Sequence, residues 1–166
     1  MTRFFFLIIA FSIVLTSCNK SSDDNACPYT DSPAVAPSTE VDNLQIYITA
    51  NYPAAIKHPS GFFYEIVATG TGATPNVCSN ISFTYSGYLT NGTKFDESLT
   101  PVEFILGRLI VGWQKGLPLI RKGGQINLYI PPSLGYGNRD VRDANNNIVV
   151  PANSNLRFNL TLVDVK

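Results

Sequence analysis

Histidine and charged residues are scarce in this chain of 166 residues. His58 is its single histidine, so histidine-based metal clusters and Ser-His or Cys-His relays gain no support. Charged residues make up 14% of the chain and the net charge is zero, which favours neither a nucleic-acid partner nor an anionic membrane surface. No phosphate-binding glycine loop is present. The carboxyl groups of Asp96 and Glu97 are adjacent and would point to opposite sides of an extended chain, which argues against a glycosidase pair. No metal and no organic cofactor is implied.

The chain opens with an almost unbroken apolar run from Phe4 to Leu15, and Arg3 is the only charge before Cys18. The run fits the core of a signal peptide and is shorter than the roughly 20 residues that span a bilayer. A buried N-terminal helix is the alternative. Elsewhere, no segment of the sequence has the composition of a membrane span.

The apolar run ends in Leu15-Thr16-Ser17-Cys18, which resembles the box that precedes the lipidated cysteine of bacterial lipoproteins. The Cys18 thiol would take the lipid, and the small residues before it would admit the processing peptidase. This resemblance implies that residues 1–17 form a cleaved signal peptide. It also implies an exported protein, anchored at Cys18 to a bacterial membrane on its periplasmic or cell-surface face, with the outer membrane favoured.

Two further cysteines, Cys27 and Cys78, remain after such processing. A disulfide between them is expected in an oxidising compartment, and the alternative is two buried free thiols. The bond would close a loop of about fifty residues and stabilise the fold by about 4 kcal/mol on the chain-entropy model.

Residues 18–37 are rich in Ser, Asp, Asn and Pro and are expected to form a flexible tether. Within it, Asp23-Asp24 is either a sorting signal or part of a solvated linker. A helix should follow, with Thr39 as a hydroxyl cap and Asp42 three residues on, and should end near Asn51. Apolar residues at helical spacing (Val41, Leu44 and Ile48) indicate one buried face. The helix is interpreted as an accessory element packed on the core, with a partner contact as the alternative.

From Gly61 onward the apolar period changes to two, which predicts half-buried strands. The residues expected on their apolar faces are Phe62, Tyr64 and Ile66; Ile81, Phe83 and Tyr85; Ile126, Leu128 and Ile130; and Leu156, Phe158, Leu160 and Leu162. Asn91-Gly92 predicts a tight hairpin turn, because both positions tolerate a positive φ.

One short helical stretch interrupts the strands. Trp113, Leu117 and Ile120 share a face, Gly123-Gly124 ends the stretch, and Pro118 should kink or shorten it. The predicted class is therefore α+β, with a mostly antiparallel sheet packed on one short helix.

Aromatic and apolar residues gather at the ends of these elements, and composition alone would assign them to an ordinary core. Their order along the chain is more specific. The segments that matter are Ile81-Ser-Phe-Thr-Tyr-Ser-Gly87, Asn91-Gly-Thr-Lys-Phe-Asp96, Phe104-Ile-Leu-Gly107, Ile110-Val-Gly-Trp113, Ile130-Pro-Pro-Ser-Leu-Gly-Tyr-Gly137, and Val150-Pro151 followed by Asn155-Leu-Arg-Phe158. In this order they resemble the FKBP family of peptidyl-prolyl isomerases, over roughly residues 60–166.

The resemblance implies an antiparallel sheet wrapped around one short helix, and it assigns a substrate pocket. Its catalytic positions map onto Tyr136, Asp96, Ile110 and Trp113. Its substrate-binding positions map onto Tyr85, Phe95, Phe104, Leu109, Val149, Val150 and Phe158. By this resemblance Trp113 is the pocket floor, while the Tyr136 hydroxyl and the Ile110 N–H hold substrate carbonyls.

Two departures from the family pattern should loosen one wall of the pocket. Val102 stands where an aromatic residue is usual, and an arginine common between the Asp96 and Phe104 positions is absent. The loop from Asn138 to Ile148 is long and polar, as in loops that select partners, or it is plain surface slack.

The expected organisation is a signal peptide (1–17), a lipid-anchored tether (18–37), an accessory helix and connection (38–59) and an isomerase domain (60–166). The expected function is isomerisation of X-Pro bonds in exported proteins, which assists their folding, so the partners are proline-containing polypeptides. The alternatives are a non-catalytic module that binds proline segments or acts as a chaperone, and a purely structural surface lipoprotein.

Overall fold

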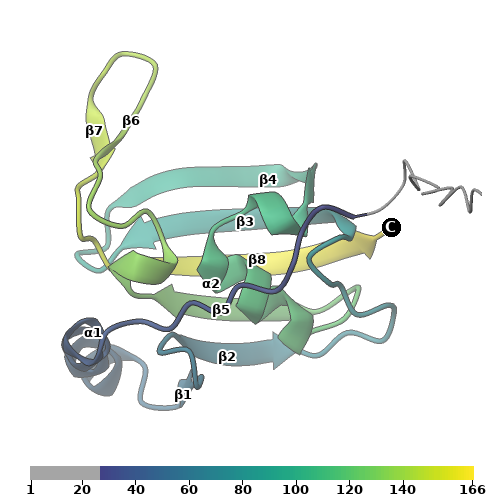
Figure 1. The fold of residues 1–166 in the computed structure, drawn as a ribbon, viewed down its shortest axis with the longest axis horizontal. Helices are drawn as coiled ribbons and strands as arrows, with labels where there is room; N and C mark the ends of the chain where they lie inside the picture. Colours follow the sequence, from purple (N-terminus) through teal and green to yellow (C-terminus); the bar gives the residue numbers. More distant parts are fainter. Residues whose placement is uncertain (1–26) are drawn as a thin grey trace, which may run out of the picture.

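A six-stranded antiparallel sheet dominates the computed structural model, which describes residues 27–166 (Figure 1). The strand order is β1-β2-β5-β8-β3-β4, and β6 and β7 form a separate two-stranded ribbon. The strands are β1 (Ile56–Lys57), β2 (Phe63–Ala68), β3 (Asn80–Leu89), β4 (Lys94–Ile105), β5 (Gln125–Ile130), β6 (Val141–Arg142), β7 (Ile148–Val150) and β8 (Leu156–Val165). The predicted signal peptide, the lipidation site Cys18 and the Asp23-Asp24 pair lie outside the described residues.

Side-chain alternation sets the two faces of the sheet. In β8, Leu156, Phe158, Leu160 and Leu162 are buried, and the residues between them are more exposed. Because neighbouring strands are antiparallel and in register, Phe158 pairs with Leu128 on β5 and with Gly87 on β3, which places all three on the buried face. The predicted strands and the α+β class are confirmed.

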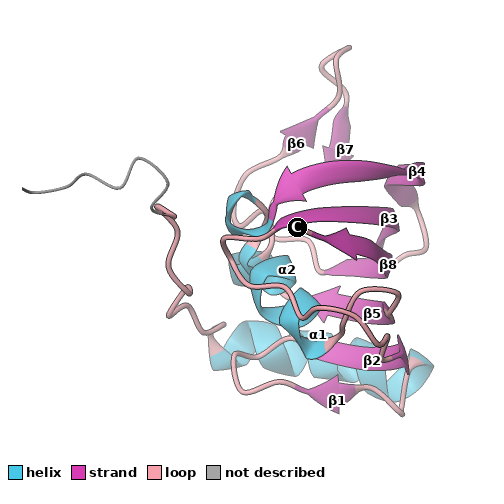
Figure 2. Ribbon diagram, turned by 90° about the vertical axis from the view of Figure 1, so that its right-hand side faces the viewer, coloured by secondary structure: helices cyan, strands magenta, loops and turns pink. Residues whose placement is uncertain are grey.

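One short helix covers this buried face, as predicted. α2 (Val111–Gly116) lies on one side of the sheet (Figure 2) and continues as a 3-10 turn, η2 (Leu117–Leu119), that contains Pro118. Proline cannot donate the next helical hydrogen bond, so the shortening at Pro118 is the expected one. A Cβ added at Gly112 would lie 2.6 Å from Ile130, so this glycine allows close packing of the helix on β5.

The accessory helix α1 (Ser38–Asn51) lies beside the β1–β2 edge of the sheet (Figures 1 and 2). Val41, Leu44 and Ile48 are buried in the main core, which confirms the predicted face. The predicted Thr39 cap is wrong, because the helix begins at Ser38, directly after Pro37, and has no side-chain cap. The Glu40 carboxylate in its first turn accepts a hydrogen bond of 2.9 Å from the Ser133 N–H.

The hairpin between β3 and β4 turns at Asn91-Gly92, but the predicted backbone is only half right. Gly92 has a φ of +91°, whereas Asn91 is not among the positive-φ residues of the described chain. The Asn91 side chain accepts the Thr93 N–H at 2.9 Å, and this bond supports the turn without a left-handed Asn91.

The long loop after β5 forms an arm that projects away from the sheet (Figure 1). β6 and β7 pair within it, and Asp143 accepts the N–H groups of Asn145 and Asn147 at its tip. These hydrogen bonds give the loop its own internal order.

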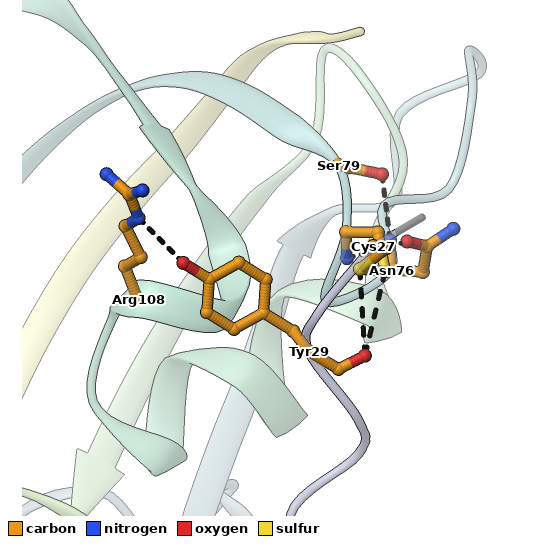
Figure 3. The surroundings of a disulfide bond; sticks show 6 residues. Cys27, Tyr29, Asn76, Ser79 and Arg108 are labelled. Atoms are coloured by element: carbon orange, nitrogen blue, oxygen red, sulfur yellow. Dashed lines mark hydrogen bonds between the residues drawn. A yellow bond between two sulfur atoms is a disulfide. The ribbon is translucent and has the colours of Figure 1, made fainter. Parts of the chain in front are cut away.

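Residues 27–37, hereafter the leader segment, run across the helical side of the sheet toward α1 (Figure 1). A disulfide joins Cys27 to Cys78, with a Cα–Cα distance of 5.7 Å (Figure 3). Farther along the segment, the Ala36 N–H donates to the Ser60 carbonyl. The prediction of a flexible tether over residues 18–37 therefore does not describe residues 27–37. Within residues 27–166, no helix is long and apolar enough to cross a membrane.

Candidate functional site

A small pocket of about 140 Å³ opens between α2, the neighbouring ends of β3, β4 and β8, and the segment after β5. Its lining residues are mostly aromatic or aliphatic, with one carboxylate: Phe83, Tyr85, Asp96, Phe104, Leu109, Ile110, Trp113, Tyr136 and Phe158. Eight of these residues were expected at the site from the sequence. Such a concave, apolar site with a few polar groups is typical of a binding pocket.

Trp113 forms the floor of the pocket and is held edge-on by three rings. Its ring centroid lies 5.1 Å from that of Phe83, 5.4 Å from Tyr85 and 5.0 Å from Phe158, with interplanar angles of 74° to 89°. T-shaped contacts of this kind fix a ring orientation better than area burial alone. The indole Nε1 is buried and has no hydrogen-bond partner within residues 27–166. The three ring contacts thus fix the orientation of the floor.

The rim of the pocket carries two tyrosine hydroxyls and one carboxylate. Tyr85 donates a hydrogen bond of 2.6 Å to Asp96. Burial, this bond and the Asp96 charge raise the pKa of Tyr85. Burial, followed by the Asp96 charge, raises the pKa of Tyr136 as well. Both hydroxyls therefore keep their protons at neutral pH, and Tyr136 remains able to donate a hydrogen bond toward the cavity.

Leu109 and Ile110 form the wall that leads into α2. Gln114 Nε2 donates to the Leu109 carbonyl at 2.7 Å, and the Ile110 carbonyl accepts the Trp113 N–H at 2.9 Å. Within residues 27–166, the Ile110 N–H makes no hydrogen bond. The wall is braced by its carbonyls, and one amide donor is left beside the cavity.

Three predicted substrate-binding residues do not line the pocket. Val150 is 1% exposed and belongs to the main core, and Val149 on the same strand does not reach the cavity. Phe95 stands behind the lining, with its ring 5.6 Å from Phe158 and 6.5 Å from Tyr136. Phe83 lines the pocket but was not assigned to it, although its alternation with Tyr85 along β3 places both on one face.

A larger hollow of about 430 Å³ lies over the other face of the sheet. Its floor is made of neutral side chains such as Thr84, Asn127 and Asn159, and the Asn159 amide donates to Asn127 at 2.6 Å. Tyr85 is the one aromatic residue among the described residues that line it. Residues 27–166 also contain no group of three or more His, Cys, Asp or Glu side chains placed to hold a metal ion. The aromatic pocket is therefore the site that we consider further.

Comparison with known proteins agrees with this choice. The family model for the FKBP-type peptidyl-prolyl cis-trans isomerase matches residues 72–163. The chain is 42% identical over 116 residues to the FKBP-type peptidyl-prolyl cis-trans isomerase FkpA of Buchnera aphidicola subsp. Schizaphis graminum, covering 66% of this chain and 43% of that protein. It thus spans less than half the length of this curated relative.

Two solved structures extend the match to the fold. The crystal structure of FkpA from Escherichia coli superposes with a TM-score of 0.65 at 32% identity, covering 78% of this chain and 58% of that one. A peptidyl-prolyl cis-trans isomerase from Pseudomonas syringae superposes with a TM-score of 0.66 at 25% identity, covering 79% and 97%. With the family model matched across every strand of the sheet except β1 and β2, this chain belongs to the FKBP-type peptidyl-prolyl cis-trans isomerase family.

Proposed function

We propose that the chain catalyses cis-trans isomerisation of X-Pro peptide bonds in the pocket over Trp113. The observation that carries this proposal is the meeting of an aromatic floor with two hydrogen-bond donors, the Tyr136 hydroxyl and the Ile110 N–H, at one small cavity. The reaction makes and breaks no covalent bond. It therefore needs no nucleophile, metal or proton relay.

The barrier to the reaction is amide resonance, worth about 18–20 kcal/mol. In the twisted amide the nitrogen is pyramidal and the carbonyl oxygen loses partial charge. Water stabilises the polar planar amide, so transfer into the surface of Trp113, Phe83 and Phe158 favours the twisted form. The pocket would thus bind the transition state more tightly than the ground state, because loss of water costs the planar amide more than the twisted one.

The two donors would fix the twist. The Tyr136 hydroxyl would hold the carbonyl of the prolyl amide, and the Ile110 N–H would hold a flanking substrate carbonyl. With both carbonyls held, the substrate can rotate only about the bond between them. The proposed substrates are proline-containing polypeptides.

The test is the rate of cis-to-trans isomerisation of a short Xaa-Pro peptide with the chain that lacks residues 1–18. Acceleration above the uncatalysed rate that falls in both Trp113→Ala and Tyr136→Phe would support catalysis at this pocket. A rate equal to that of the uncatalysed reaction, measured with the folded protein, would exclude isomerase activity. If peptide binding persisted in that case, the second candidate would hold, namely a module that grips proline segments without turnover.

One observation favours this second candidate. Phe104 is 48% exposed, and Val102 stands two residues before it, at the position where the family resemblance implies an aromatic ring. The β4 wall of the pocket is consequently open to solvent. An open wall weakens the exclusion of water on which the proposed catalysis depends.

We further propose that the protein is exported and lipid-anchored at Cys18, where it assists folding beyond the inner membrane. The apolar run at Phe4–Leu15, the Thr16-Ser17-Cys18 sequence and the Cys27–Cys78 disulfide support this location. Metabolic labelling with a clickable fatty acid should mark the wild-type chain and not Cys18→Ala. Label on both or on neither would contradict the anchor, and protease treatment of intact cells would assign the membrane face.

A further inference from the structure

The leader segment contacts the turn that carries the pocket wall. This turn, η1 (Leu106–Arg108), ends one residue before Leu109. Two residues after Cys27, Tyr29 lies against it, and Figure 3 shows its ring beside the η1 ribbon with its hydroxyl toward Arg108. The contact joins residues separated by 79 positions, so it is a tertiary contact.

Tyr29 holds the turn in two ways. A Cβ added at Gly107 would lie 2.7 Å from the Tyr29 Cβ and closer still to its ring, so Gly107 leaves room for Tyr29 to pack against the backbone. Arg108 Nε donates a hydrogen bond of 2.7 Å to the Tyr29 hydroxyl. The ring and the hydroxyl thus contact consecutive residues of η1.

The segment around Cys78 bonds the same turn through its backbone. The Gly107 N–H donates to the Val77 carbonyl at 2.8 Å, and the Leu106 N–H donates to the Ser79 carbonyl at 3.0 Å. The Cys27–Cys78 disulfide therefore joins two segments that both contact η1. Cross-linking them limits how far Tyr29 can move from Gly107.

From η1 the constraint passes directly to the pocket. Leu109 and Ile110 follow Arg108 in the chain, and Gln114 Nε2 bonds the carbonyls of both Gly107 and Leu109, at 3.3 and 2.7 Å. The Ile110 carbonyl in turn accepts the first N–H bonds of α2, including that of Trp113. A shift of η1 would move the Ile110 donor and the Trp113 floor together.

We infer that Tyr29 is a positioning residue for the isomerase site, holding the Leu109–Ile110 wall through η1 while the disulfide holds Tyr29. This inference rests on the proposed function. Tyr29 does not touch the cavity, so its effect on catalysis would pass through the backbone of the wall. Misplacement by about 1 Å can reduce a rate by about 100-fold.

The experiment compares wild type, Tyr29→Ala, Tyr29→Phe and Ile48→Ala in the full chain kept in detergent. Ile48 is 2% exposed in α1, does not line the pocket, and serves as a control for general destabilisation. At a temperature where all four are folded, kcat/KM should fall about tenfold in Tyr29→Ala. Tyr29→Phe keeps the ring against Gly107 and should remain within about threefold of wild type, as should Ile48→Ala.

A second readout does not require turnover. Trp113 is the only tryptophan in the sequence, so emission excited where tyrosine does not absorb reports on the pocket floor. Tyr29→Ala should shift this emission to longer wavelength and increase its quenching by acrylamide, whereas Tyr29→Phe and Ile48→Ala should leave both unchanged.

Wild-type kcat/KM in Tyr29→Ala, or an equal loss in Ile48→Ala, would overturn the inference. If wild type itself does not catalyse, the proposed function fails, and the Trp113 emission then decides the positioning role alone. An emission unchanged by Tyr29→Ala would overturn that role, and the predicted shift would support a positioned pocket without isomerase activity.

Discussion

Asp96 accepts a hydrogen bond of 2.6 Å from the Tyr85 hydroxyl, and its charge also raises the pKa of Tyr136. One carboxylate on β4 thus acts on a tyrosine of β3 and on a tyrosine after β5. It orients the first by a hydrogen bond and influences the second through its field. The Tyr85 ring, fixed in this way, stands 5.4 Å from Trp113 and supports the pocket floor.

Asp96→Asn should lower isomerase kcat/KM by about three- to tenfold, since an amide makes a weaker bond to Tyr85 than a carboxylate does. It should also lower the pKa of Tyr136 toward its ordinary value, because the nearby negative charge is removed. Peptide assays measure the first effect and an ultraviolet titration, compared with Tyr136→Phe, measures the second. Glu97→Gln is the matched control on the adjacent residue, and an equal loss there would contradict a specific role for Asp96.

Tyr136→Phe should reduce kcat/KM by about tenfold, which corresponds to one hydrogen bond of roughly 1.4 kcal/mol in the transition state. The Tyr136 side chain is 37% exposed, so the melting temperature of the variant should differ little from that of the wild type. The same peptide assay and a thermal melt check both statements. A large loss of stability with unchanged activity would instead make Tyr136 a packing residue.

Alkaline pH should weaken the fold through its tyrosines. Burial and a hydrogen bond to Tyr52 raise the pKa of Tyr47 to about 12, and burial with the Glu65 hydrogen bond raises the pKa of Tyr129. A raised folded pKa means that the unfolded chain loses these protons first. The stabilisation is therefore complete below about pH 10 and is lost as pH rises through the folded values. Denaturant unfolding at increasing pH should show this fall. Tyr129→Phe should make this fall smaller. An unfolding free energy that stays the same above pH 10 would contradict the prediction.

The sequence predicted those parts of the site that depend on short-range periodicity or on family motifs. Alternation along β3 and β8 was enough to place Tyr85 and Phe158 on the buried face. The same alternation would have placed Phe83 beside Tyr85 at the pocket. Val149 and Val150 were assigned by motif alone, and neither lines the cavity, with Val150 buried in the main core. A motif preserves order along the chain and does not fix which side chains reach a cavity.

The packed leader segment could not be read from composition. Its Ser, Asp and Pro content is that of a linker, yet Tyr29 and Cys27 fasten it to residues more than fifty positions away. The disulfide was expected from the two cysteines and is confirmed, whereas the Tyr29 contact is tertiary and no local propensity records it. The Thr39 cap failed for a local reason, since the helix already begins at Ser38 and Thr39 lies inside it.

Loss of the disulfide should cost about 4 kcal/mol of unfolding free energy, because the bond closes a loop between residues separated by 51 positions. Cys27→Ser with Cys78→Ser, compared with wild type in denaturant unfolding, measures this cost. The removed constraint acts mainly on the unfolded chain, which becomes less compact and exposes more surface, so the slope of free energy against denaturant should increase. A cost near zero would show that the leader contacts suffice alone.

Gly87→Ala should disturb the pocket by displacing the rings that support its floor. Gly87 lies on β3 opposite Phe158, and an added Cβ would come within 2.7 Å of Phe95 Cζ and 2.8 Å of Phe158 Cε1. Rings packed edge-to-face cannot yield by this amount without moving Trp113, whose centroid is 5.0 Å from that of Phe158. We expect a loss of about 1–3 kcal/mol in stability, together with a fall in kcat/KM larger than in the Ser86→Ala control on the same strand. Because Gly87 has an ordinary negative φ, the backbone accepts alanine and any effect belongs to the rings. Equal activity in the two variants would mean that Phe158 can shift without disturbing the pocket floor.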